Sequence, residues 1–315
     1  MFGQKKDWET RENAFAAFSM GPLTDFWRQR EEAEFKGVDD VPVRFVRFCA
    51  QHNDRLVLIC PGRIESYVKY AEVAYDLFHS GFDVMIIDHR GQGRSGRLLS
   101  DTHRGHVVNF SDYVDDLAAL WQQQVVPGHW RKRFILAHSM GGAIATLFLQ
   151  RYQAHCDAIA LCAPMFGIII RLPDWMVRHI LDWAEGHQRI REEYAIGTGR
   201  WRALPFAVNV LTHSRQRYRR NLRFYADEPR LQVGNDLLNK LMRQRGDKTM
   251  LFRKGNKYIR GNSAILGMRP PGEYLNTCNF TRLAVKNGLI HRSELALNNG
   301  CIQRFYRCTG EETGQ

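Results

Sequence analysis

The sequence predicts an α/β protein built on a mostly parallel sheet that helices cover. Short β-rich apolar runs alternate with helix-length amphipathic segments through the first half of the chain, the pattern of successive strand–helix–strand units. A chain of 315 residues with 44% hydrophobic residues can also bury one large core. One broad domain with an insertion is therefore sufficient to account for its length.

The expected strands are short runs of aliphatic, β-branched and aromatic residues. They are Val43–Phe48, Arg55–Cys60, Val84–Asp88, Phe134–Ala137 and Ala158–Cys162. Between them, Tyr67–His79 and Tyr113–Gln123 have the spacing of amphipathic helices and break off near Gly81 and Pro127.

Three regions follow from changes in sequence texture. Residues 1–167 form the expected first part of the core. Tryptophans and arginines then recur at helical spacing, without a clear strand, which predicts an inserted helical cap over 168–230. Residues 231–315 are atypical, because strand and helix periodicity is weak there, and 236–315 carries fourteen Lys/Arg against six Asp/Glu. This last region does not resemble the close of a parallel sheet.

Charge and cysteine content indicate the kind of binding partner and the cellular compartment. The net charge of +12 favours an anionic partner, either membrane phosphates or nucleic acid. Seven cysteines without a C-x-x-C pair suit a reducing compartment. The charged N-terminus lacks the apolar stretch of a signal peptide, and no run is long enough to cross a bilayer. We therefore expect a soluble or peripheral protein.

Ser139 is the candidate nucleophile. It stands between an apolar strand and a small-residue helix in the sequence Ala137-His-Ser-Met-Gly, a variant of the nucleophile elbow in which a sharp turn lifts the serine hydroxyl above the sheet. The following helix directs its first N–H groups at a developing oxyanion, and Met140 supplies one of them. The alternative is an ordinary strand-to-helix turn with an incidental serine.

Two further loops follow strands. Pro61-Gly62 ends one strand, and the glycine lets the backbone approach a substrate, so the Arg63 N–H is the expected second oxyanion donor; alone, Pro-Gly is only a turn. The loop from Asp88 to Ser95 has glycines at positions 91 and 93 but lacks the third glycine of a dinucleotide site. It is interpreted as structural. No histidines are paired at metal-ligand spacing.

Four motifs together carry a resemblance to a known family. They are Pro61-Gly62-x-x-Glu65 to Tyr70, Asp88-x-x-Gly91-x-Gly93-x-Ser95, Tyr113 to Asp116 and His138-Ser139-Met140-Gly141-Gly142. With these, the chain resembles the monoacylglycerol lipase and lysophospholipase branch of the α/β-hydrolases. Within that branch it resembles the bacterial inner-membrane lysophospholipases over residues 1 to about 233, through Trp8–Arg30, Arg63-Ile-Glu-Ser-Tyr, Asp88-His-Arg-Gly-Gln-Gly-Arg-Ser and Gly197-Thr-Gly-Arg-Trp-Arg-Ala-Leu-Pro. The resemblance implies release of the fatty acid from a lysophospholipid, without metal or organic cofactor, by a peripheral protein at the cytoplasmic face of the inner membrane.

The tail departs from that family, which completes its catalytic triad after the cap. No acid follows the weak strand Thr249–Phe252, so the catalytic acid stays unassigned. His291, in a G-x-x-H sequence after an apolar stretch, is the candidate general base. Either the tail has diverged and docks differently, or it is read out of frame. Its composition favours the second hypothesis, under which the enzyme is disabled.

Two aromatic and basic segments remain open to several interpretations. Residues 215–225 interleave arginines with aromatics, which fits a solvated helix, a contact with lipid headgroups, or stacking on single-stranded nucleic acid; nucleic acid is the least favoured partner. The aromatic N-terminal residues either form an interfacial face or cover the core. They are Phe15, Phe18, Leu23, Phe26 and Trp27.

The sequence thus predicts a serine ester hydrolase acting on lysophospholipids at an anionic membrane surface. One alternative is a monoacylglycerol lipase or carboxylesterase. The other is a disabled hydrolase fold that binds anionic membrane or nucleic acid. The sequence makes no prediction of oligomeric state.

Overall fold

The computed structural model describes residues 11–165, 192, 194, 199–209 and 212–234, together with the backbone of 291–298 and 301–307. The first part of the expected cap, at 168–191, lies outside the described residues, as does the weak strand Thr249–Phe252. The boundaries predicted for the cap stay predictions.

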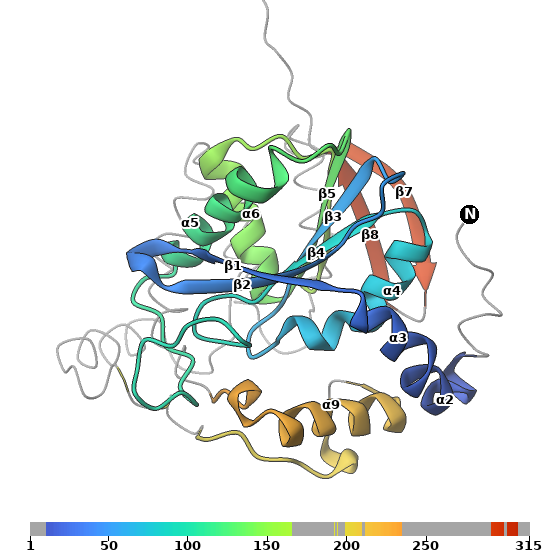
Figure 1. The fold of residues 1–315 in the computed structure, drawn as a ribbon, viewed down its shortest axis with the longest axis vertical. Helices are drawn as coiled ribbons and strands as arrows, with labels where there is room; N and C mark the ends of the chain where they lie inside the picture. The colour runs from blue at the N-terminus through green and yellow to red at the C-terminus, as the bar shows by residue number, and fades with distance from the viewer. Residues whose placement is uncertain are drawn as a thin grey trace, which may run out of the picture.

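One eight-stranded sheet runs through the molecule in the order β1-β2-β4-β3-β5-β6-β8-β7 (Figure 1). The strands are β1 Glu31–Lys36, β2 Pro42–Phe48, β3 Arg55–Cys60, β4 Asp83–Ile87, β5 Lys132–His138, β6 Ala158–Cys162, β7 His291–Asn298 and β8 Cys301–Arg307. The central strands β4, β3, β5 and β6 are parallel, whereas both flanks are antiparallel. The predicted α/β class with a mostly parallel sheet is confirmed.

Helices cover both faces of this sheet (Figure 1). In the described part of the chain, the helices longer than one turn are α2 Phe15–Met20, α3 Pro22–Arg28, α4 Ala71–His79, α5 Ser111–Leu120 with a π-helical extension Trp121–Val125, α6 Met140–Tyr152 and α9 Arg215–Asp227. Single turns of 3-10 helix lie at Val38–Asp40, Tyr67–Tyr70, Phe206–Val208 and Pro229–Leu231. Helices α5 and α6 lie over one face, and α2, α3, α4 and α9 lie on the other side.

The five strands predicted from the sequence are all present, within one or two residues at each end. Their apolar runs are readable because central parallel strands are buried on both faces; every residue of β4 is buried. Strand β1 was missed, since its sequence Glu-Glu-Ala-Glu-Phe-Lys buries only Phe35. A polar edge strand carries little of the apolar signal on which strand prediction depends.

The N-terminal aromatic residues cover the core, which was one of the two interpretations of that segment. Phe15, Leu23 and Phe26 are 1 to 4% exposed. Phe26 stacks on Phe48 of β2 with ring centroids 4.2 Å apart, so the segment closes one face of the sheet. Burial of this size stabilises the fold by about 2 kcal/mol per side chain.

The tail supplies two strands that the sequence analysis did not predict. Strand β8 pairs antiparallel with β6, and β7 pairs with β8. Their short apolar runs gain regular structure from pairing with a sheet edge, a long-range interaction that local periodicity does not contain.

Candidate active site

Ser139 occupies a strained turn between β5 and α6. Its φ of 49° and ψ of −115° lie in a region that residues with a Cβ rarely adopt, at a cost on the order of 1 to 3 kcal/mol. Hydrogen bonds from both sides hold it there: the Ser139 N–H donates to the Cys162 carbonyl at 3.0 Å, and the Met165 N–H donates to the Ser139 carbonyl at 2.8 Å. This is the geometry of the predicted nucleophile elbow.

Small residues around Ser139 let strand and helix approach closely. Ala137 is fully buried. A Cβ placed on Gly141 would lie 2.5 Å from the Pro61 carbonyl oxygen, far inside van der Waals contact. Met140 is the first residue of α6, where backbone N–H groups have no acceptor within the helix. The predicted donor at Met140 therefore stands at the positive end of the helix dipole.

The loop after β3 reaches the same point. A Cβ on Gly62 would lie 3.2 Å from the Ser139 Cβ, so the peptide that joins Gly62 to Arg63 runs beside the nucleophile. The structure thus brings together Ser139, Met140 and the Gly62–Arg63 loop, as the sequence predicted. Their roles in catalysis stay predictions of the sequence.

Glu65, which stands in the Pro61-Gly62-x-x-Glu65 motif, is a member of this region to which sequence reasoning assigned no role. Its Oε2 accepts hydrogen bonds from the Gly62 N–H and the Tyr70 hydroxyl, each at 2.6 Å, and from His138 Nδ1 at 3.0 Å. Burial acts to raise the pKa of Glu65, but His138, Lys69 and Tyr70 outweigh it and hold the pKa at about 2. An ionised carboxylate therefore lies between the Gly62 N–H and His138, the residue before Ser139.

The loop after β4 is structural, as expected, and also contributes to the site. The Ser95 hydroxyl donates to the Asp88 carbonyl at 2.5 Å and accepts from the Arg44 N–H at 2.8 Å. Gln92, which is 2% exposed, donates to the Gly62 carbonyl at 2.8 Å. The only sequence signal for Gln92 was its position after a strand, at the same edge of the sheet as Ser139.

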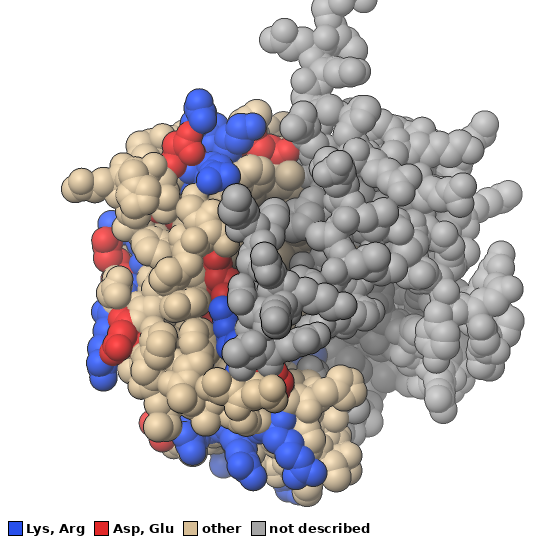
Figure 2. Space-filling view, turned by 90° about the vertical axis from the view of Figure 1, so that its right-hand side faces the viewer, with Lys and Arg blue, Asp and Glu red and all other residues tan. Residues whose placement is uncertain are grey.

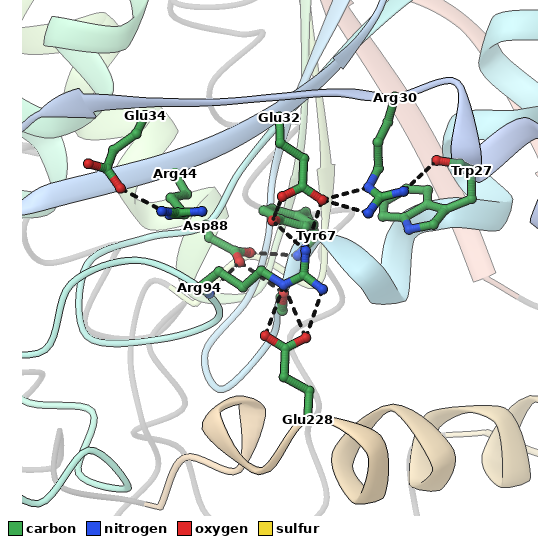
Figure 3. Close-up of polar contacts among 10 residues, drawn as sticks. Trp27, Arg30, Glu32, Glu34, Arg44, Tyr67, Asp88, Arg94 and Glu228 are labelled. Atoms are coloured by element: carbon green, nitrogen blue, oxygen red, sulfur yellow. Dashed lines mark hydrogen bonds and ion pairs between the residues drawn. The ribbon is translucent and has the colours of Figure 1, made fainter.

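Arg94, from that same loop, joins the core to helix α9 (Figure 3). Its guanidinium donates to both carboxylate oxygens of Glu228, at 2.8 to 3.0 Å, and to Glu32 at 2.8 Å. The Arg94 N–H donates to Asp88 at 2.8 Å. A bidentate pair of this kind fixes orientation as well as distance. It therefore anchors the segment after α9 to the loop after β4.

His291 is not brought to Ser139 by the backbone. It is the first residue of β7, and the register through β8 sets it one residue before the level of Ile159, near the amino end of β6. Ser139 follows the carboxyl end of β5, beyond the level of Cys162. At about 3.3 Å per residue, the two positions are separated by roughly 15 Å along the strands. The role of His291 as base stays a prediction of the sequence, and the acid stays unassigned.

Neither a metal centre nor a membrane span is found in the part of the chain that the structure describes. No group of three or more His, Cys, Asp or Glu side chains within those residues could hold a metal ion. No helix among them is long and apolar enough to cross a bilayer.

Comparison with known proteins assigns the chain to a family. The family model described as serine aminopeptidase, S33, matches residues 51–245, which include the strained Ser139 and both loops beside it. The chain belongs to this family of hydrolases. The predicted α/β-hydrolase resemblance is thereby confirmed.

Among individual proteins, this hydrolase is 80% identical to lysophospholipase L2 of Escherichia coli over 234 residues, covering 74% of this chain and 69% of that protein. A probable lysophospholipase L2 of Haemophilus influenzae is 29% identical over 229 residues, covering 71% of each chain. A monoacylglycerol lipase of Mycolicibacterium smegmatis is 31% identical over 136 residues, covering 43% of this chain and 47% of that protein.

Proposed function

We propose that this hydrolase releases the fatty acid from lysophospholipids. The observation that carries the proposal is the strained Ser139 at the start of α6 with the Gly62 loop against it. The substrate class comes from the similarity to lysophospholipase L2. Neutral monoacylglycerols are the second candidate substrate, because the chain is also similar to a monoacylglycerol lipase.

The geometry supports a two-step reaction through an acyl-enzyme. Ser139 Oγ attacks the ester carbon while its proton passes to a base, and the carbonyl becomes an oxyanion. The Met140 and Arg63 amides stabilise that oxyanion, a contribution typically worth 10²- to 10³-fold in kcat per donor. The glycerophospho alcohol leaves with a proton, and water then attacks the acyl-Ser139 ester, releasing the fatty acid and the free serine.

Helix α9 supports a membrane-associated location for this activity. Residues 199–223 contain seven arginines and no acidic residue. Arg217 turns inward to the Glu72 carboxylate, at 2.7 and 2.9 Å, whereas three arginines at four-residue spacing are exposed. These are Arg215, Arg219 and Arg223. Figure 2 shows Lys and Arg gathered at the lower end of the molecule, where Figure 1 places α9.

Apolar side chains adjoin that row of arginines. Leu204 and Val208 are 55 and 58% exposed. Their segment packs on α9, with the rings of Phe206 and Tyr218 5.5 Å apart. Exposed apolar residues beside exposed arginines that form no ion pair within the described part of the chain suit a bilayer with anionic headgroups. On this proposal the protein is peripheral, at the cytoplasmic side of the bacterial inner membrane, and binds through α9.

The first test is fatty-acid release from lysophosphatidylethanolamine and from monoacylglycerol by the wild type, Ser139→Ala and His291→Ala. We expect release from the lysophospholipid, abolished in Ser139→Ala. Loss in His291→Ala as well would identify the base, whereas an unchanged rate would mean that the base lies elsewhere, as the strand register indicates. A wild-type chain as inert as Ser139→Ala would contradict the proposal and favour a disabled hydrolase.

The second test is sedimentation with vesicles containing phosphatidylglycerol. Each arginine near an anionic surface is worth about 1 kcal/mol, so replacing all three exposed arginines of α9 by Gln should lower partitioning about a hundredfold. A matched control replaces Arg28, Arg47 and Arg131, which lie outside α9 in surface ion pairs, and changes the net charge equally. Equal losses in the two triple variants would refute a docking role for α9.

A further inference from the structure

The loop of residues 62–65 contains the Arg63 N–H, which is expected to donate a hydrogen bond to the oxyanion. Side chains as well as backbone contacts fix the conformation of this loop. Ile64 in this loop has a φ of 56°, in the left-handed region that a β-branched residue rarely adopts. A strained backbone persists only when surrounding contacts determine it. Two side chains supply those contacts in the structure, one from within the loop and one from the loop after β4.

Glu65 ties the loop to the nucleophile elbow. A single oxygen, Oε2, accepts from the Gly62 N–H at the start of the loop and from His138, the residue immediately before Ser139. The Tyr70 hydroxyl donates to the same oxygen at 2.6 Å. With a side chain only 20% exposed, Glu65 is a charged acceptor shared by the two segments that must keep a fixed separation.

Gln92, in the loop after β4, bonds the loop of residues 62–65 through its side-chain amide. Its Nε2 donates to the carbonyls of Gly62 and Glu65, at 2.8 and 3.0 Å, and its Oε1 accepts from the Ile64 N–H at 3.1 Å. Three backbone groups of a four-residue loop are thus bonded to one buried amide. Both hydrogen-bonding atoms of the Gln92 amide are used, so neither a carboxylate nor a shorter chain reproduces the arrangement.

We propose that Glu65 and Gln92 are positioning residues that hold the peptide after Gly62 at the distance from Ser139 that oxyanion binding requires. Oxyanion donors are effective because they are oriented before the charge develops. A misplacement of about 1 Å can cost 10²-fold in rate. This inference rests on the proposed ester hydrolysis, since it assigns a role within that reaction.

The kinetic test compares Glu65→Ala, Glu65→Gln and Gln92→Ala with Glu31→Ala, a surface carboxylate of β1 that pairs with Arg47. We expect kcat on lysophosphatidylethanolamine to fall about 100-fold in the two alanine variants, with KM changed less than threefold. Glu65→Gln keeps an acceptor for the Gly62 N–H and should recover about tenfold. Glu31→Ala should match the wild type. Unchanged kcat in the alanine variants of an active enzyme would overturn the inference.

Hydrogen exchange of the backbone amides tests the same inference without requiring hydrolysis. We expect the Gly62 amide to exchange at least tenfold faster in Glu65→Ala, and the Ile64 amide in Gln92→Ala, while amides of β3 and β5 keep wild-type rates. Loop amides unchanged in both variants would show that these side chains do not hold the loop. An inert wild type with the expected exchange would instead contradict the proposed function while leaving the anchoring of the loop established.

Discussion

At the scale of single residues, the site depends on close backbone contact. Helix α6 begins so near the end of β3 that a Cβ on Gly141 would lie 2.1 Å from the Cys60 carbonyl oxygen, whereas a Cβ on Gly62 would lie 2.8 Å from the side chains of Glu65 and His138. Close approach of the backbone therefore requires glycine at position 141. Ser139, between strand and helix, adopts a strained backbone conformation that projects its hydroxyl from the turn. This strain lowers the stability of the folded protein.

Gly141→Ala tests this packing. We expect a loss of about 1 to 3 kcal/mol in the free energy of unfolding, because the added methyl meets backbone carbonyls that cannot move aside easily. Ester hydrolysis should fall with it, since the displaced atoms belong to the loop beside Ser139. Urea denaturation measures the first effect. Gly199→Ala is the control, because no atom of the described residues, apart from Gly199 and its chain neighbours, lies within 4 Å of a Cβ at that position. Equal stability of the two variants would contradict the account.

At the scale of elements, α9 is connected to the core by ion pairs at both ends. Arg217 near its start bonds Glu72 of α4, and Glu228 just after its end bonds Arg94 in the loop after β4. Tyr225, 8% exposed, packs between them against the core. The inward face is thus neutralised by the protein itself, whereas Arg215, Arg219 and Arg223 on the outward face form no ion pair with the described residues.

Glu228→Gln should loosen the C-terminal end of α9. Because the pair is bidentate and the two side chains are 25 and 31% exposed, we expect a loss of about 1 kcal/mol, at the upper end for partly exposed ion pairs. Amides of residues 222–227 should exchange faster in hydrogen-exchange mass spectrometry. The control is Glu34→Gln, which removes a cross-strand pair with Arg44 in a more exposed setting; faster exchange of α9 in that variant would argue against a local anchor.

At the scale of the whole molecule, Glu65 links the site to acid stability. Its pKa of about 2 lies below the ordinary value of 4.5, so its contribution to stability is fully present above pH 4.5 and is lost as the pH falls toward 2. The shift corresponds to a contribution of about 3 kcal/mol. Urea midpoints of wild type and Glu65→Gln, measured from pH 6 to pH 3, should converge as the pH falls. Parallel curves would contradict the assigned ionisation.

Sequence reasoning found the central strands, the elbow and the Pro61-Gly62 loop because each has a local signature. A strand buried on both faces is a continuous apolar run, and a nucleophile elbow needs small residues at set positions. It gave Glu65 no hydrogen-bonding role, because His138, which donates to Glu65, is 73 positions away, and it missed Gln92 as a partner of the loop, because Gln92 is 27 positions from Glu65. It also missed β1, whose charged residues face solvent at a sheet edge.

The sequence by itself determined the α/β class and the nucleophile candidate, and its motifs carried the resemblance to the family, because periodicity, small-residue spacing and short motifs are properties of neighbouring positions. Only the tertiary structure decided which polar groups form hydrogen bonds, such as the three donors to Glu65 and the bonds of Gln92 to the loop of residues 62–65. It also decided which α9 arginines point inward and which point outward. It also placed His291 near the amino end of β6, whereas Ser139 follows the carboxyl end of β5. These arrangements depend on strand order and register, which are set by contacts between residues distant in the chain.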